Sequence, residues 1–346
     1  MKVELPCGSR CQVCLVLTIV FSVCLVACVD RDNDSTRSTN PLFPIYKNNK
    51  AGYIDSTGSV VIPPKFDTAE AFNEGLARVE VGDKWGYTDA TGGYAIEPRF
   101  DSAFSFFDGY AVVEVKGRFG FLDAKEAFLL PPQFEDALSF SEGVAAVKTH
   151  GKWGFVNAAG EFQIPPKYDN VFSFFQQRAA VQSNNKWGFI DKTDKEIVPI
   201  QYAEVNSFSE GLAGVSENGM WGYIDREGEW VIAPEYEEVH SFSAGLASVA
   251  KNGEWGFIDR SGGVRIAFQF KNAFNFSEGL APVRRAKGWG YVDAAGARVI
   301  KAQFQFAVPF QNGLARVELT SGSAWIDELG RILWSSQESP SPSSPY

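Results

Sequence analysis

The chain has 346 residues, a net charge of −10 and 14% aromatic residues. An acidic chain with no basic cluster in its sequence is a poor match for nucleic acid, because affinity for nucleic acid comes largely from neutralised phosphates. We therefore expect no nucleic-acid partner. All five cysteines lie within the first 28 residues, so the rest of the chain cannot form a disulfide or a thiolate metal site.

The first segment has the pattern of an export signal. Lys2 and Arg10 precede an apolar run from Val13 to Ala27. A run of about 15 residues is short for a bilayer-spanning helix and typical of the hydrophobic region of a signal peptide. The sequence thus predicts a signal peptide over residues 1–27, with an uncleaved membrane anchor as the alternative.

The tetrapeptide Leu25-Val26-Ala27-Cys28 resembles the lipobox of bacterial lipoproteins. This resemblance implies that Cys28 receives a diacylglycerol and becomes the first residue of a membrane-anchored protein of the cell envelope. Because Val29 rather than Asp follows, the chain is similar to lipoproteins sent to the outer membrane of some Gram-negative bacteria. The polar residues that follow cannot bury a core, so residues 28–41 are expected to form a flexible tether.

Residues 42–334 form a tandem array with a strict period of 34 residues. A Trp-Gly-aromatic motif marks most copies, and Phe119 replaces the Trp in one of them. A fixed period in this range is typical of a modular array rather than of ordinary domains. Counting two weaker copies at the ends, we predict nine units. The motif Trp residues are Trp85, Trp153, Trp187, Trp221, Trp255 and Trp289.

One unit, residues 76–109, illustrates the predicted local structure. Apolar residues alternate over 76–81, which predicts a strand with one buried and one exposed face. A second strand over 85–89 is apolar on both faces and is expected to be central, with Gly86 allowing another backbone or ring to approach closely. A third strand covers 94–96. The unit is therefore an antiparallel three-stranded meander, followed by a connector with a short fourth strand or one helical turn.

Three short strands cannot bury this much aromatic surface alone, so neighbouring units must stack. We expect the six motif Trp residues to form the repeated core, with a sugar-stacking platform as the alternative. An all-β open solenoid is favoured over a closed propeller-like ring, because 34 residues and three strands are few for a propeller blade. Ala51 and Ser323 replace Trp in the end units, which suggests capping repeats.

The array resembles the bacterial WG-repeat (KWG-repeat) family. The segment Phe208-Ser209-Glu210-Gly211-Leu212-Ala213, followed by Trp221-Gly222-Tyr223-Ile224-Asp225, carries the resemblance most fully. The resemblance implies an all-β repeat protein, often exported or lipid-anchored, with a presumed role in protein–protein interaction. The family has no catalytic residues to transfer. Gln177 departs from the glycine column, so we expect local strain or a rearranged turn there.

Catalytic and metal chemistry find little support in the sequence. The array contains two histidines, His150 and His240, and neither has a nucleophile at motif spacing. The repeated Asp after the second strand is interpreted as a turn cap, with a calcium ligand as the alternative. We therefore predict no enzyme activity, no metal and no cofactor.

The first strand of each unit suggests a binding face. Its alternate Ala and Val columns stay constant, whereas the columns between them vary, and these include Arg78, Arg284 and Arg316. We interpret the varied columns as an exposed face that meets a partner. An unknown protein is the favoured partner, and peptidoglycan or another envelope glycan is the alternative. The Ser- and Pro-rich residues 335–346 are expected to be a disordered tail.

Overall fold

The computed structural model describes residues 40–337. The predicted signal peptide 1–27, the predicted lipidation site Cys28 and most of the predicted tether lie outside the described residues, as do residues 338–346 of the predicted tail. Every helix or strand found in residues 40–337 is a β-strand. This part of the chain contains no helix with the length and apolarity needed to cross a bilayer.

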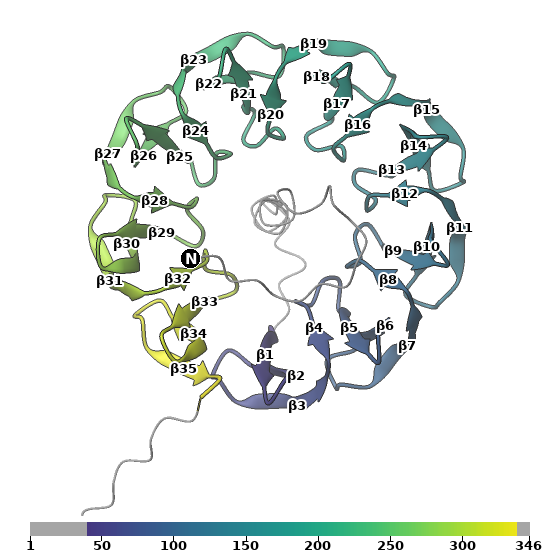
Figure 1. Ribbon diagram of the computed structural model, residues 1–346, viewed down its shortest axis with the longest axis horizontal. Coiled ribbons are helices and arrows are strands. Elements are labelled where there is room, and N and C mark those ends of the chain that lie inside the picture. The colour runs from purple at the N-terminus through teal and green to yellow at the C-terminus, as the bar shows by residue number, and fades with distance from the viewer. Residues whose placement is uncertain (1–39, 338–346) are drawn as a thin grey trace, which may run out of the picture. The chain divides into compact units, whose positions relative to one another are not determined.

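The strands form nine small antiparallel sheets, which we call blades 1–9 in chain order. The described residues of blade 1 supply three strands, β1 (Phe43–Lys47), β2 (Lys50–Ile54) and β3 (Val60–Phe66). Blades 2–9 have four strands each, and each strand pairs with the next one along the chain. The predicted meander is therefore present. Figure 1 shows the first strand of each four-stranded blade nearer the middle of the ring and the last on its outer edge.

The two inner positions of blades 2–9 hold a two-residue strand and then a strand of five or six residues. The first strands are β4 (Thr68–Ala69), β8 (Ser102–Ala103), β12 (Asp136–Ala137), β16 (Asn170–Val171), β20 (Glu204–Val205), β24 (Glu238–Val239), β28 (Asn272–Ala273) and β32 (Phe306–Ala307). The second strands are β5 (Ala77–Val81), β9 (Tyr110–Val115), β13 (Val144–Thr149), β17 (Ala179–Ser183), β21 (Ala213–Glu217), β25 (Leu246–Lys251), β29 (Leu280–Arg285) and β33 (Leu314–Leu319).

The two outer positions hold the Trp-Gly motif strand and an edge strand, which has seven residues in blades 2–8 and four described residues in blade 9. The third strands are β6 (Lys84–Thr88), β10 (Arg118–Asp123), β14 (Lys152–Asn157), β18 (Lys186–Ile190), β22 (Met220–Ile224), β26 (Glu254–Asp259), β30 (Gly288–Asp293) and β34 (Gly322–Asp327). The fourth, or outer, strands are β7 (Tyr94–Phe100), β11 (Phe128–Phe134), β15 (Phe162–Tyr168), β19 (Glu196–Tyr202), β23 (Trp230–Tyr236), β27 (Val264–Phe270), β31 (Arg298–Phe304) and β35 (Ile332–Ser335).

The connector supplies the fourth strand, and it does so for the following blade. Ala103, in the connector after β7, pairs with Val113 of β9 rather than with its own unit. Each 34-residue sequence unit therefore completes the sheet of its neighbour. This interlocking joins consecutive sequence units by backbone hydrogen bonds within each sheet, whereas side-chain packing joins consecutive blades.

The motif glycine permits a close approach between the third and fourth strands. A Cβ atom at Gly86 would lie 2.5 Å from the carbonyl oxygen of Ile96 and 2.6 Å from the nitrogen of Pro98. The outer strand shifts register at this point, because Trp85 pairs with Phe100 and Tyr87 pairs with Ile96. The predicted close approach is confirmed, and the approaching group is backbone.

The hydrophobic core is divided among the junctions between blades. Each of nine clusters of buried residues contains side chains from two neighbouring blades. At eight junctions an aromatic residue of the third strand meets a Phe of the next connector, with ring centroids 4.7–4.9 Å apart, as for Tyr87 and Phe106. These rings contact edge to face or tilted, as aromatic pairs prefer.

The ninth junction joins blade 9 to blade 1 and closes the ring (Figure 1). Phe43 and Trp325 have ring centroids 5.1 Å apart, and the Trp325 Nε1–H donates to the Pro44 carbonyl at 2.9 Å. Leu314, Leu333 and Trp334 join the same cluster. We call this junction the seam.

The expectation of an open solenoid is therefore wrong, and the closed ring that was its alternative is correct. The connector adds a fourth strand in blades 2–9, so these units are full propeller blades despite their 34 residues. The end units are not caps. Ala51 is fully buried, and the end units pack against each other through the seam.

Candidate functional site

The first residues of the outer strands form an exposed apolar column on the outer edge of the ring, at equivalent positions on seven blades. The exposed fraction of these side chains runs from 37% at Trp230 to 55% at Val264. We call the set the rim band. Its members are Val60, Tyr94, Phe128, Phe162, Trp230, Val264 and Ile332.

The outer strand's own pattern explains this exposure. In β7, Tyr94 and Ala95 are exposed, whereas Ile96 and Phe100 are buried in the junction with blade 3. The same pattern recurs in the other seven-residue outer strands, except that the second residue is half-buried in two of them, at Leu129 and Ile197. The exposed rings are still held in place, since Tyr94 lies 6.0 Å from Phe66 of the preceding blade and Trp230 lies 6.0 Å from Tyr202.

The motif Trp residues mostly lie inside the ring junctions. Trp153, Trp187, Trp255 and Trp289 are buried, and Trp85 and Trp221 are half-buried. Several stack on a connector side chain of their own blade, for example Trp289 on Phe274 with centroids 5.1 Å apart and planes 10° apart. Buried rings cannot offer a free face to a sugar, so these residues support the core interpretation over a sugar platform.

The varied column that contains Arg78, in the first predicted strand of each unit, was expected to be exposed. This expectation is wrong for most of the column. Val112, Ala146, Ala180 and Ser248 of this column are all buried. The reason is that both faces of this strand pack between blades: Ala145 belongs to the junction of blades 3 and 4, and its neighbour Ala146 belongs to the junction of blades 4 and 5.

The three arginines proposed as a binding face have different surroundings. Arg78 is half-buried, donates to the Ala103 carbonyl at 2.6 Å and lies over the Trp85 ring, 4.9 Å from its centroid. Arg316 is exposed and forms an ion pair with Glu318 at 2.8 Å. Arg284 is exposed on β29. Arg78 therefore links two blades and is not available as a simple contact residue.

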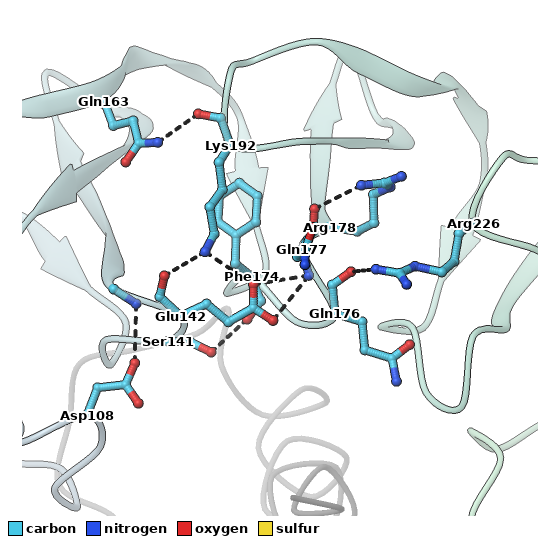
Figure 2. A network of polar contacts seen from close by, with 11 residues as sticks. Asp108, Ser141, Glu142, Gln163, Phe174, Gln176, Gln177, Arg178, Lys192 and Arg226 are labelled. Carbon is cyan, nitrogen blue, oxygen red and sulfur yellow. Dashed lines mark hydrogen bonds and ion pairs between the residues drawn. The ribbon is translucent and has the colours of Figure 1, made fainter. Parts of the chain in front are cut away.

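Polar loops connect the blades near the middle of the ring. The Glu142 carboxylate accepts from the Gln177 backbone N–H at 3.0 Å. Figure 2 shows the Lys192 side chain directed at Glu142. The Lys192 ammonium donates to the Glu142 carbonyl at 2.6 Å. Gln176 and Gln177 have φ of 50° and 62°, and Phe175 pairs with Arg178 as in the other connectors. Of the two expected alternatives at Gln177, the rearranged turn is wrong, whereas local strain agrees with a non-glycine residue in the left-handed conformation.

The two histidines have different environments. His150 lies in the exposed turn between β13 and β14. The ring of His240 stacks on Trp255, and desolvation by burial lowers the pKa of the imidazole to about 4. Its Nδ1 lies 2.8 Å from the hydroxyl of Ser248, a contact that the sequence did not reveal.

This histidine–serine contact has the character of packing. Ser248 has no exposed surface, and its hydroxyl donates to Asn275 Oδ1 at 3.2 Å. With the hydroxyl proton directed at Asn275, the His240 Nδ1–H is the donor to the serine oxygen. A nucleophilic serine needs the reverse arrangement and access for a substrate.

The repeated Asp caps its turn. Asp259 Oδ1 accepts from the Ser261 hydroxyl at 2.6 Å and from the backbone N–H groups of Ser261 and Gly263, both at 2.9 Å. The hydrogen bond from the Ser261 hydroxyl is the main reason that the pKa of Asp259 falls to about 2. These bonds confirm the predicted capping role. Among the described residues, no group of three or more potential ligands could hold a metal ion.

Sequence reasoning missed the rim band, although a signal was present. The column of Tyr94 varies among aromatic, aliphatic and charged residues and includes Glu196 and Arg298, whereas the columns of Ile96 and Phe100 stay apolar. Variation of this kind between repeats indicates an unburied position. The varied positions that are exposed therefore lie on the outer strand, and not on the first predicted strand of the unit.

Comparison with known proteins identifies the repeat and the fold. Eight consecutive segments match a family described as "WG containing repeat", at residues 52–85, 85–118, 119–153, 153–187, 187–221, 221–255, 255–286 and 289–320. Among curated proteins, none matches the sequence.

Solved structures share the fold at low sequence identity. A structure described as a eukaryotic initiation factor has 11% identity and a TM-score of 0.63, and the match covers 86% of this chain and 96% of that one. Weaker likenesses include the dihydro-heme d1 dehydrogenase NirN, with 12% identity, a TM-score of 0.46 and coverage of 76% and 73%. Hsv2p of Kluyveromyces lactis has 10% identity, a TM-score of 0.40 and coverage of 56% and 74%.

Proposed function

The chain belongs to the family of WG-containing repeat proteins, and from this premise we propose that it is a non-catalytic ring scaffold that binds another protein through the rim band. The supporting observation is the column of exposed aromatic and aliphatic side chains on seven blades. Large apolar and aromatic side chains are the residues that most often anchor protein–protein interfaces. A monomer would have no physical need to expose them at the same place in blade after blade.

Glycan binding is the second candidate, and Tyr94 and Trp230 are the residues that favour it. Their rings are 40% and 37% exposed, and sugars stack on such faces. However, Val60, Val264 and Ile332 share the column and offer no ring face. A partner that contacts the whole band must accept aliphatic side chains, which is a property of protein surfaces more than of polysaccharides.

A pair of surface variants tests the interface. Tyr94→Ser with Phe128→Ser removes two rim-band rings from β7 and β11, and the matched control, Glu97→Ser with Gln133→Ser, changes exposed polar residues on the same strands. A photo-crosslinker at position 162 would capture partners in native envelopes for quantitative mass spectrometry. We expect the rim pair to lose a partner that the control keeps, with both melting like wild type.

The same variants separate the two candidates. Equal capture by both pairs would show that the rim band is not the interface. Loss of binding to purified, protease-treated peptidoglycan in the rim pair alone would favour the glycan binder instead.

We further propose that Cys28 anchors the ring to a membrane of the cell envelope, the outer membrane if the host is Gram-negative. The support is the lipobox-like Leu25-Val26-Ala27-Cys28 after an apolar run, followed by Val29. Metabolic labelling with a fatty-acid probe should mark wild type and leave Cys28→Ser unlabelled. Equal labelling of the two proteins would contradict the anchor.

A further inference from the structure

Blade 8 carries a group of cations that its neighbours lack. Arg285, Lys287, Arg298 and Lys301 line an open depression with a volume of about 530 Å³, together with Ala286 and Ala302. No acidic residue lines it. We call it the blade 8 basic depression. The sequence shows no basic cluster, because these residues come from β29, the β29–β30 turn and β31 and are gathered only by the fold.

No carboxylate among the described residues neutralises the four cations. In the part of the chain that the structure describes, none of them forms an ion pair, whereas twelve other lysines and arginines do. Arg285 lies over the Phe270 ring, 4.7 Å from its centroid. Its one polar contact of this kind, to Gln269 Oε1, is long at 3.5 Å. Like charges placed together in an acidic chain repel one another and are relieved by a bound anion.

The ring itself does not require these charges. At the positions equivalent to Lys287, Arg298 and Lys301, the other eight blades have no cation at all. The position of Arg298 belongs to the rim-band column, which is apolar on seven blades. Because eight blades fold without these residues, packing of the blade does not account for their presence.

A second observation concerns the β29–β30 turn, which supplies Ala286 and Lys287 to the depression. In five blades, a carboxylate from the segment before the first strand accepts from the backbone N–H of the turn between the second and third strands, as Asp67 does from Gly82 at 2.8 Å. Blade 8 has Lys271 at that position, and its ammonium is directed to Glu254 at 3.4 Å. Blade 8 thus has a cation where five blades have a carboxylate, whereas blades 6 and 9 have the uncharged Ala203 and Gln305 there.

From these observations we infer that the blade 8 basic depression binds a small phosphorylated molecule carrying at least two phosphate charges. Phosphate presents several acceptor oxygens to arginine forks and lysine ammonium groups, whereas one arginine satisfies a single carboxylate. The volume lies in the range of small-molecule sites, about 300–1,000 Å³. A long polyanion or an anionic bilayer would also face the rest of this chain, whose net charge is −10, so a free compact ligand fits best.

Inorganic pyrophosphate is the probe for the test, with the full chain in calorimetry at low salt. We expect binding that weakens as salt is added. The double variant Lys287→Gln with Arg298→Gln should weaken it by roughly tenfold or more, since two charge-assisted contacts are lost. The matched control is Lys116→Gln with Arg118→Gln, which removes two exposed cations at the equivalent turn of blade 3. The control should bind within about twofold of wild type, because Lys116 and Arg118 do not line the depression and their contribution falls further as salt is added.

Three results would overturn the inference. One is the absence of pyrophosphate binding by the wild type. Another is an equal loss in both double variants, which would indicate bulk charge rather than a site. The last is binding to phosphatidylglycerol vesicles that depends on Lys287 and Arg298 without any binding of pyrophosphate, which would make a lipid headgroup the ligand. Unchanged melting temperatures of both variants would show that any loss of binding is not a loss of fold.

Discussion

The eight junctions between consecutive blades and the seam close the same ring by different means. At a regular junction, a connector strand passes into the next sheet and an aromatic pair 4.7–4.9 Å apart fills the core. At the seam, the ring centroids of Phe43 and Trp325 lie 5.1 Å apart. Among the described residues, no connector strand passes from blade 9 into the sheet of blade 1. Within residues 40–337, the indole hydrogen bond from Trp325 to Pro44 has no counterpart at the other junctions.

The difference shows what a departure from the repeat means. Trp325 replaces the usual Tyr or Phe and lies where the last blade meets the first. Ser323, which replaces the motif Trp, pairs with Glu318 inside blade 9. At Trp325 the repeat changes where its neighbour is different. Ala51 and Phe119 show that the motif Trp can also be replaced at a regular junction.

The largest effect is expected at a regular junction. Phe257 has no exposed surface and contacts Phe270 and Phe276, so Phe257→Ala should lower the free energy of unfolding by about 3–5 kcal/mol. Urea denaturation would measure it. The matched control is Phe162→Ala in the rim band, expected within about 0.5 kcal/mol of wild type. A similar loss in both variants would mean that the rim ring also serves the core.

The seam should respond locally. Phe43 is 4% exposed, so Phe43→Ala should cost about 2–4 kcal/mol, but mainly by opening the junction of blades 1 and 9. Hydrogen exchange would then accelerate in β1, β2 and β34 while β18 and β22 keep their protection. Uniform acceleration around the ring would contradict a seam that opens separately.

Acid should weaken one regular junction selectively. The pKa of His240 falls to about 4 in the folded protein, below the ordinary value of about 6.5. The unfolded chain therefore binds this proton first, so the stability contributed by neutral His240 is fully present above pH 6.5 and is lost as pH falls from 6.5 towards 4. The slope is at most about 1.4 kcal/mol per pH unit.

The variant His240→Phe should remove that part of the pH dependence. Phe104, Phe172 and Phe274 occupy the equivalent positions in other blades, so the substitution follows the repeat. Melting temperatures between pH 7 and pH 5 would fall less in the variant than in wild type. Parallel curves for the two proteins would show that the imidazole does not control this window.

The smallest effect concerns the polar bond of the seam. Trp325→Phe keeps a ring against Phe43 but removes the indole donor to Pro44. The expected cost is about 1 kcal/mol, the usual net value of one hydrogen bond. Equilibrium denaturation with Trp289→Phe as a control would separate the lost bond from the lost ring size, and equal costs would show that ring size alone matters.

Local structure was predictable from the sequence because it depends on neighbours within a unit. The alternation around Val79, the turn-capping Asp89 and the close approach at Gly86 all follow from period, turn chemistry and the absence of a side chain. Closure was not predictable in this way, since it depends on a small rotation per blade that accumulates over the whole array. The exposed Tyr94 and the bridging Arg78 were misjudged for a related reason: burial in this ring is decided by the neighbouring blade.

Closure also changes what the gain or loss of one repeat would mean. In an open stack, an extra unit lengthens the array and leaves every other contact as it was. In this ring, each cluster of buried residues belongs to two blades, and the last blade must meet the first. A tenth unit would alter the angle at every junction and separate Phe43 from Trp325, so the number of copies is fixed by the circle as a whole.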